Sequence, residues 1–330
     1  MKLKLSPIHL LLINALHNTA KAATTHKTLR GLQGKQIFSP RDKSIEECTL
    51  LMKITRFEGD IETEDIECED GDGIYVLEGL NNADKDYIIE KIKTGVYASG
   101  RDILKVPGSK VMKGKLEIGN NGVHVEKRAN GGRRMAVTTG QKETLALWVQ
   151  AADASTSTTP RGSTGSISDE IFGTHGDNVN LRSQYNSCSF DQVDFFPATG
   201  ASTNGPVVSE GVFDVQISET VAGVDNSIIR SAVQSAATTQ LGNLPAQYNH
   251  VMMCLPPGTS GGWIAYAYIN HWLSVYNDQW CNYPSGQMHE LGHNLNLAHA
   301  GEGTGQYDDQ SGMVSLICCV LYEFTLVIEC

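Results

Sequence analysis

The sequence predicts an α/β (α+β) fold in which a mixed sheet carries a histidine-bearing helix and a small β-rich region comes first. Two observations predict this fold. From residue 143 onward strand-like and helix-like patterns alternate, and the clearest helix, residues 226–241, lies between two strand-like runs. In residues 24–142, short strand-like runs are separated by glycine and by Asn-Gly or Asn-Asn turns, which is typical of a small β module.

Within the β-rich region we expect strands at residues 73–77, 87–89 and 111–118. The stretch Phe57–Gly73 is densely acidic. Its spacing lacks the pattern of a calcium-binding loop, so we expect a solvated acidic loop there.

In the second region, the order strand, helix, strand over residues 211–255 predicts a parallel pair joined by a right-handed crossover. Asp225 or Asn226 is expected to cap the central helix and Gly242 to end it. One of the last two strands should form a sheet edge, where an extended polypeptide can bind as an added strand. We expect strands at 144–151, 190–196, 211–218, 250–255, 263–269 and 272–276, and helices from 166–170 and at 179–188 and 226–241.

Composition limits the function. The 330 residues suffice for two domains, or for one large domain with an appendage, and 40% hydrophobic residues supply a sizeable core. A net charge of -11 argues against nucleic acid and against anionic membranes as partners. No segment has the apolar length of a stable membrane span; the nearest, Val314–Ile328, is short and contains Glu323.

The first residues resemble a secretory signal peptide. A basic start is followed by a short apolar run and by the small-x-small sequence Ala20-Lys21-Ala22. We therefore expect a signal at residues 1–22 and a secreted, extracellular protein; the alternative is an amphipathic helix kept in the mature chain. The eight cysteines suit an oxidising compartment. Their connectivity is open, although a Cys254–Cys281 bridge is expected.

The stretch Met288–Ala300 carries the chemistry. His289 and His293 are four residues apart, so on a helix both imidazoles can reach one metal ion. Glu290 projects beside that ion and is the candidate general base. His299 can be a third ligand only if the chain reverses first, and Asn296 is the residue expected to adopt the necessary positive φ. Three histidines leave Zn2+ a fourth position for water, as in catalytic zinc sites.

The pattern His-Glu-x-x-His-x-x-Asn-x-x-His, followed by Tyr307–Met313, resembles the metzincin zinc endopeptidases, and within them the gametolysin family. The resemblance covers roughly residues 143–314. It implies a metzincin-like zincin catalytic domain there, with Met313 in a turn beneath the metal. It also implies a secreted endopeptidase that cleaves extended polypeptides of the extracellular matrix or cell wall. Zinc would activate a water from which Glu290 takes a proton.

In such a protein, residues 23–142 would be a β-rich propeptide or an accessory domain. A propeptide would cover the active site, with the thiolate of Cys48 or Cys68 as one candidate zinc ligand. Arg133-Arg134 would be a processing site.

Residues 315–330 form an atypical apolar tail that departs from the family pattern, an apparent truncation of its C-terminal subdomain. Two alternative functions therefore stay open. One is a catalytically impaired or truncated homologue, and the other is a zinc-dependent binding protein. The oligomeric state is also open.

Overall fold

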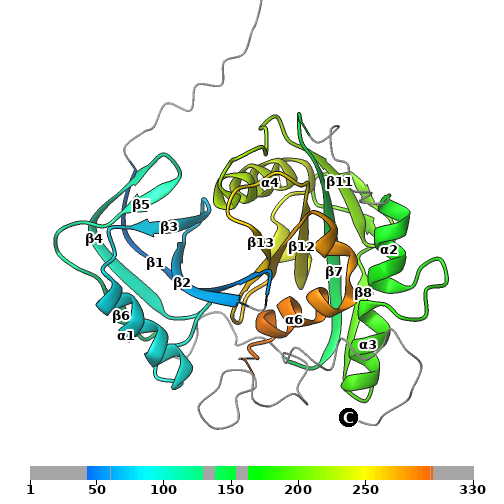
Figure 1. Ribbon diagram of the computed structural model, residues 1–330, viewed down its shortest axis with the longest axis horizontal. Coiled ribbons are helices and arrows are strands. Elements are labelled where there is room, and N and C mark those ends of the chain that lie inside the picture. Colours follow the sequence, from blue (N-terminus) through cyan, green and yellow to red (C-terminus); the bar gives the residue numbers. More distant parts are fainter. Residues whose placement is uncertain (1–42, 60, 129–137, 154–162, 298, 300–330) are drawn as a thin grey trace, which may run out of the picture. The chain divides into compact units, whose positions relative to one another are not determined.

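The computed structural model describes residues 43–59, 61–128, 138–153, 163–297 and 299 (Figure 1). The first part is a small β barrel, residues 43–126. Its strands close into a ring, because β1 pairs with both β2 and β4, and β3 and β5 complete the circle. This strand order is that of the OB fold, a five-stranded Greek-key barrel. The elements are β1 (Lys43–Phe57), β2 (Ile61–Glu69), β3 (Ile74–Glu78), α1 (Asn82–Lys93), β4 (Ile103–Met112), β5 (Lys115–Glu117) and β6 (His124–Glu126).

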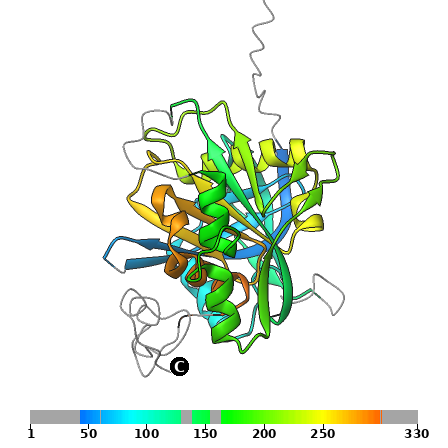
Figure 2. The same cartoon turned by 90° about the vertical axis from the view of Figure 1, so that its right-hand side faces the viewer.

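The second part, residues 138–297, has helices on both faces of its strands. Helix α4 packs on one face through Ile229, Val233 and Ala237. The other face is covered by α2, α3 and α6, and Figure 2 shows α2 and α3, in green, in front of the strands. The elements are β7 (Gly140–Gln150), α2 (Thr164–Phe172), α3 (Leu181–Cys188), β8 (Val193–Pro197), β9 (Gly200–Ala201), β10 (Val207–Val208), β11 (Val212–Gln216), α4 (Asn226–Leu241), α5 (Leu244–Gln247), β12 (His250–Leu255), β13 (Trp263–Tyr268), β14 (Leu273–Asn277), the 3-10 helix η3 (Asp278–Asn282) and α6 (Pro284–Asn294).

The mixed sheet of the second part confirms the expected α+β class. Strands β11 and β12 are both parallel to β7, which lies between them, and β12 is parallel to β14. The expected parallel pair is therefore separated by one strand. Strand β13 is antiparallel to β14.

The expected free sheet edge is wrong, because β1 of the barrel pairs antiparallel with β13 from Lys53↔Tyr268 to Phe57↔Trp263. A single 12-stranded sheet thus runs from β11 through β13 into the barrel. The sequence could not show this pairing, since a strand pattern reveals buried faces but not which distant strand is the neighbour.

Two local expectations in the barrel are also wrong. Residues 87–89 belong to α1, where Asn81 caps the N-terminus and Ile88 and Ile89 face the core. The acidic stretch after Phe57 is mostly strand β2 rather than a solvated loop. In the second part, helix α4 spans the expected residues, with Asp225 as its cap and Gly242 at its end.

Within the described ranges, none of the helices combines the length and the apolar character that a membrane crossing requires.

Candidate metal centre

Helix α6 places His289, Glu290 and His293 in the protein interior. The helix starts with Pro284 at its first position and is buried from Gln287 to Asn294. It is held from several sides: the Tyr185 hydroxyl donates to the Met288 carbonyl (2.6 Å). The Asn294 amide donates to the carbonyls of Tyr268 and Leu273 (3.0 and 2.9 Å). These bonds fix the rotation of α6 against β13 and β14, and with it the direction of the two histidines.

The end of α6 reverses the chain as expected. Asn296 has φ 71°, in the left-handed region, which confirms its predicted role. The backbone N–H of Asn296 donates to the His293 carbonyl, and that of Leu297 donates to the Gly292 carbonyl, both at 2.9 Å. These two bonds form a Schellman motif, with Asn at the position where glycine is most common. The turn lets His299 return to the helix.

The three histidine rings converge. Nε2 of His289 lies 3.1 Å from Nε2 of His293. The ring centroid of His299 is 5.6 Å from that of His289 and 4.9 Å from that of His293. A fourth group joins them, the carboxylate of Glu62 from β2. One candidate ligand atom from each of the four residues can be chosen so that all lie within 4.8 Å of one another.

This donor set fits zinc. The Leu297 carbonyl lies 3.0 Å from Nδ1 of His293. A carbonyl can only accept, so Nδ1 carries the proton and the Nε2 lone pair faces the cluster. Ligand atoms of a tetrahedral zinc with bonds of 2.0–2.1 Å lie roughly 3.3–3.4 Å apart. The observed separation of 3.1 Å between the two Nε2 atoms is close to that spacing.

Glu290 is almost fully buried, with 1% of its surface exposed. Its Oε2 has no hydrogen-bond partner among the described residues. Burial and the nearby Glu62 carboxylate raise the pKa of Glu290 well above its usual value, while Arg56 opposes this shift. A buried carboxylate with an unpaired oxygen beside a cluster of candidate metal ligands is suited to accept a proton from a water molecule.

Burial favours the neutral form of His289 and His293. Burial lowers the pKa of His293 well below its usual value, and the adjacent His289 and His299 add to the effect. Burial also lowers the pKa of His289, although Glu62 opposes it. Neutral imidazole is the form that binds metal. For Glu62 itself, burial alone would raise the pKa, but the contacts with His289 and His299 outweigh burial and lower it.

Both disulfides of the described residues bear on the site. Cys48 pairs with Cys68 inside the barrel, so the expectation that either thiolate binds zinc is wrong. Cys254 pairs with Cys281, as expected, and ties β12 to the segment that enters α6. Met313, expected beneath the metal, lies outside the described residues, as do residues 1–22, Arg133-Arg134 and the tail 315–330.

Glu62 was missed by the sequence reasoning. Several residues close to it in the chain are also acidic, among them Asp60, Glu64 and Asp65, so nothing in the pattern separates one buried carboxylate from a run of exposed ones. The alternation that buries Ile66 and Cys68 does mark a strand, but not its partner.

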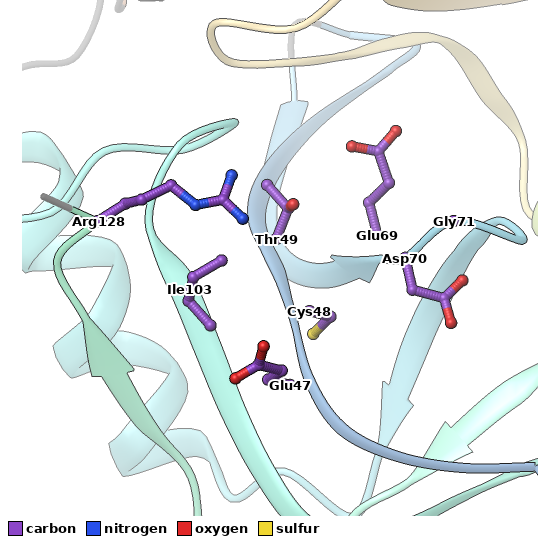
Figure 3. Close-up of a pocket in the computed structure, with 8 residues that line it drawn as sticks. All are labelled: Glu47, Cys48, Thr49, Glu69, Asp70, Gly71, Ile103 and Arg128. Atoms are coloured by element: carbon purple, nitrogen blue, oxygen red, sulfur yellow. The ribbon is translucent and has the colours of Figure 1, made fainter. Parts of the chain in front are cut away.

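A separate hollow lies on the barrel, and none of the metal-cluster residues lines it. Figure 3 shows the guanidinium of Arg128 and the carboxylates of Glu47, Glu69 and Asp70 around this hollow. It contains neither histidine nor a buried base, and it is not a second candidate for the chemistry. Its lining is Glu47, Cys48, Thr49, Glu69, Asp70, Gly71, Ile103 and Arg128.

Comparison with known proteins bears on this geometry. Comparison with curated proteins gave no match. The family model of gametolysin peptidase M11 matches residues 152–319, slightly more than half of the 330 residues, including all three histidines and Glu290. The chain belongs to the gametolysin peptidase M11 family, a family of metallopeptidases, as the histidine motif had indicated.

Proposed function

We propose that this metallopeptidase is a secreted zinc endopeptidase that hydrolyses extended polypeptides of the extracellular matrix or cell wall. The observation that carries the proposal is the convergence of His289, His293 and His299 beside the buried Glu290. The secreted location rests on the signal-like residues 1–22, and the substrate class rests on the family. Residues 23–142 are proposed as its propeptide.

Three residues would hold the metal and one would move protons. His289, His293 and His299 would bind zinc through Nε2, and α6 with its C-terminal turn holds the three rings in place. When bound, zinc lowers the pKa of a water molecule and polarises a carbonyl oxygen. Glu290 accepts the proton of the attacking water and passes it to the leaving amine. No serine or cysteine nucleophile is required, and no described residue is assigned to stabilise the oxyanion.

The test measures zinc and cleavage separately. The full chain and the variants Glu290→Gln and His293→Ala are analysed for zinc by mass spectrometry and for cleavage of an unfolded protein, before and after brief trypsin treatment. The parent should hold one zinc and cleave in at least one of the two states. Glu290→Gln should keep zinc and lose about 10²–10⁴-fold in rate, the usual contribution of a general base. His293→Ala should lose zinc.

Two results would contradict the proposal in different ways. Cleavage by Glu290→Gln at the parent rate would exclude Glu290 as the base. Bound zinc without cleavage in either state would favour the zinc-dependent binding protein over the peptidase. A chelator that abolishes cleavage, with recovery on adding zinc, would complete the expected pattern.

A further inference from the structure

Glu62 reaches the candidate metal centre from the barrel. It is the second residue of β2, just after the turn that joins β1 to β2. Its Oε1 lies 3.1 Å from Nε2 of His289, and its Oε2 lies 2.5 Å from Nε2 of His299. The side chain of Glu62 is 4% exposed, so it is buried against the histidines rather than directed into solvent.

These contacts have the chemistry of a fourth ligand. Three imidazole nitrogens leave tetrahedral zinc one open position, and carboxylate oxygen is among the atoms that zinc accepts. The carboxylate of Glu62 lies against the Nε2 atoms of two of the three histidines, within reach of an ion that the three rings would share. A site with three histidines and one carboxylate is closed, whereas catalysis needs the fourth position for water.

The same hairpin also occupies the strand edge. Strand β1 pairs antiparallel with β13 over Lys53↔Tyr268 to Phe57↔Trp263, directly before the turn that leads to Glu62. In the sheet, β13 is the outermost strand of the second part, next to the barrel, and an extended polypeptide binds such an edge by adding a strand. The backbone groups that such a polypeptide would use on β13 are already bonded to β1.

A contact outside the strand ladder also holds the barrel against the second part of the chain. Asn270, in the turn after β13, donates its backbone N–H to the His293 carbonyl (3.0 Å) and its side-chain amide to the Ser99 carbonyl of the barrel (2.9 Å). The residue that positions the end of α6 therefore also binds the barrel.

We propose that Glu62 is the fourth ligand of the metal in the full chain, and that the barrel thereby holds the peptidase inactive. The strand β1 blocks the polypeptide-binding edge at the same time. Activation then requires that Glu62 and β1 leave the site. This inference rests on the proposed zinc site and names the residue by which the peptidase is regulated.

The test measures the coordination of the bound metal rather than peptidase activity. Cobalt(II) replaces zinc, and its visible absorption reports the kind and number of its ligands. Spectra of the cobalt-loaded full chain are recorded with increasing azide for the parent, Glu62→Ala and Asp65→Asn. Asp65→Asn is the matched control, since it also removes one carboxylate from β2, but one that is 43% exposed and paired with Lys85.

The parent spectrum should not change with azide, because all four positions are filled. Glu62→Ala should have a different spectrum that responds to azide, and its zinc affinity, measured by competition with a chelator, should fall at least about 10-fold. Asp65→Asn should behave like the parent in every measurement.

Glu62→Gln tests whether a folding defect explains the result of Glu62→Ala, since glutamine keeps the size of the side chain but is a weaker metal ligand than a carboxylate. Its cobalt spectrum should shift in the same direction as that of Glu62→Ala. Identical spectra, azide responses and zinc affinities for parent, Glu62→Ala and Glu62→Gln would overturn the assignment of Glu62 while leaving the zinc site intact. A parent chain that binds neither zinc nor cobalt would overturn both the inference and the proposed function.

Discussion

At the scale of single residues, the third histidine depends on the backbone conformation of Asn296. This residue has φ 71° and a largely exposed side chain, so its contribution is conformational. Among non-glycine residues, Asn tolerates the left-handed region better than most, and a β-branched residue tolerates it poorly. The position of His299 should therefore depend on which residue type occupies position 296.

We predict that Asn296→Val destabilises the protein by about 1–2 kcal/mol and weakens zinc binding. Asn296→Gly, the control, should leave both within about 0.5 kcal/mol of the parent, because glycine adopts positive φ without strain. Urea unfolding and chelator competition measure the two effects. Equal behaviour of the valine and glycine variants would show that the turn does not position His299.

A second residue, Glu170 on α2, makes stability depend on pH. Burial, followed by the neighbouring Asp177 and Asp169, raises the pKa of Glu170 to about 7. Its Oε2 has no hydrogen-bond partner among the residues that the structure describes. In the unfolded chain this carboxyl has its ordinary pKa of 4.5. Between these two values the folded protein binds the proton more tightly, so stability falls as pH rises from about 4.5 through 7.

Glu170→Gln should remove the fall in stability that accompanies the rise in pH. We expect the variant to be more stable than the parent by about 1–2 kcal/mol at pH 8, less than the full shift implies because water screens a half-buried group. At pH 5 the difference should be much smaller. Urea unfolding at both pH values tests this, with Glu90→Gln, whose side chain is 62% exposed, as the control. A difference independent of pH would mean that Glu170 is not the cause.

At the scale of elements, the sequence predicts those features that depend on residues close together in the chain, such as helix ends. Asp225 and Gly242 bound α4 as expected, because an N-cap and a glycine with positive φ both act within one turn of the helix end. The run at 87–89 is helical although a strand was expected, because three consecutive apolar residues are too few to distinguish a strand from a helix. Asn81, which accepts from the Asp84 N–H at 2.9 Å, was the signal that favours the helix.

The candidate metal centre likewise combines residues that are close in the chain with one that is distant. His289, Glu290 and His293 share one helix, and Asn296 turns the chain back to His299, so spacing alone predicted four of the residues at the site. Glu62 comes from a distant strand, and its position depends on the pairing of β1 with β13 and with β2. Such pairing is decided by tertiary packing, which the sequence of one strand does not specify.

At the scale of the whole molecule, a buried charge network joins the barrel to the second part. Arg230 on α4 donates to Glu67 on β2 (2.8 Å) and to the Ile74 carbonyl (2.6 Å). The Tyr268 hydroxyl and Lys53 also donate to Glu67, at 2.8 and 2.6 Å. Arg230 and Glu67 are each 1% exposed. Removing one partner would leave the other charge buried and unpaired, which is more costly than losing both.

We predict that Glu67→Ala destabilises the full chain by about 3–5 kcal/mol, and that the double variant Glu67→Met with Arg230→Met loses much less. Because one 12-stranded sheet joins the two parts, removal of the Glu67 carboxylate should lower the stability of the barrel and of the second part by the same amount. Tryptophan fluorescence reports the second part, which holds all four tryptophans, whereas far-ultraviolet circular dichroism reports the whole chain. The two urea transitions should coincide in the parent and shift together in Glu67→Ala. If the fluorescence transition stayed in place while part of the circular dichroism signal was lost earlier, the barrel would unfold as an independent domain, and it could then release the metal centre without disturbing the fold behind it.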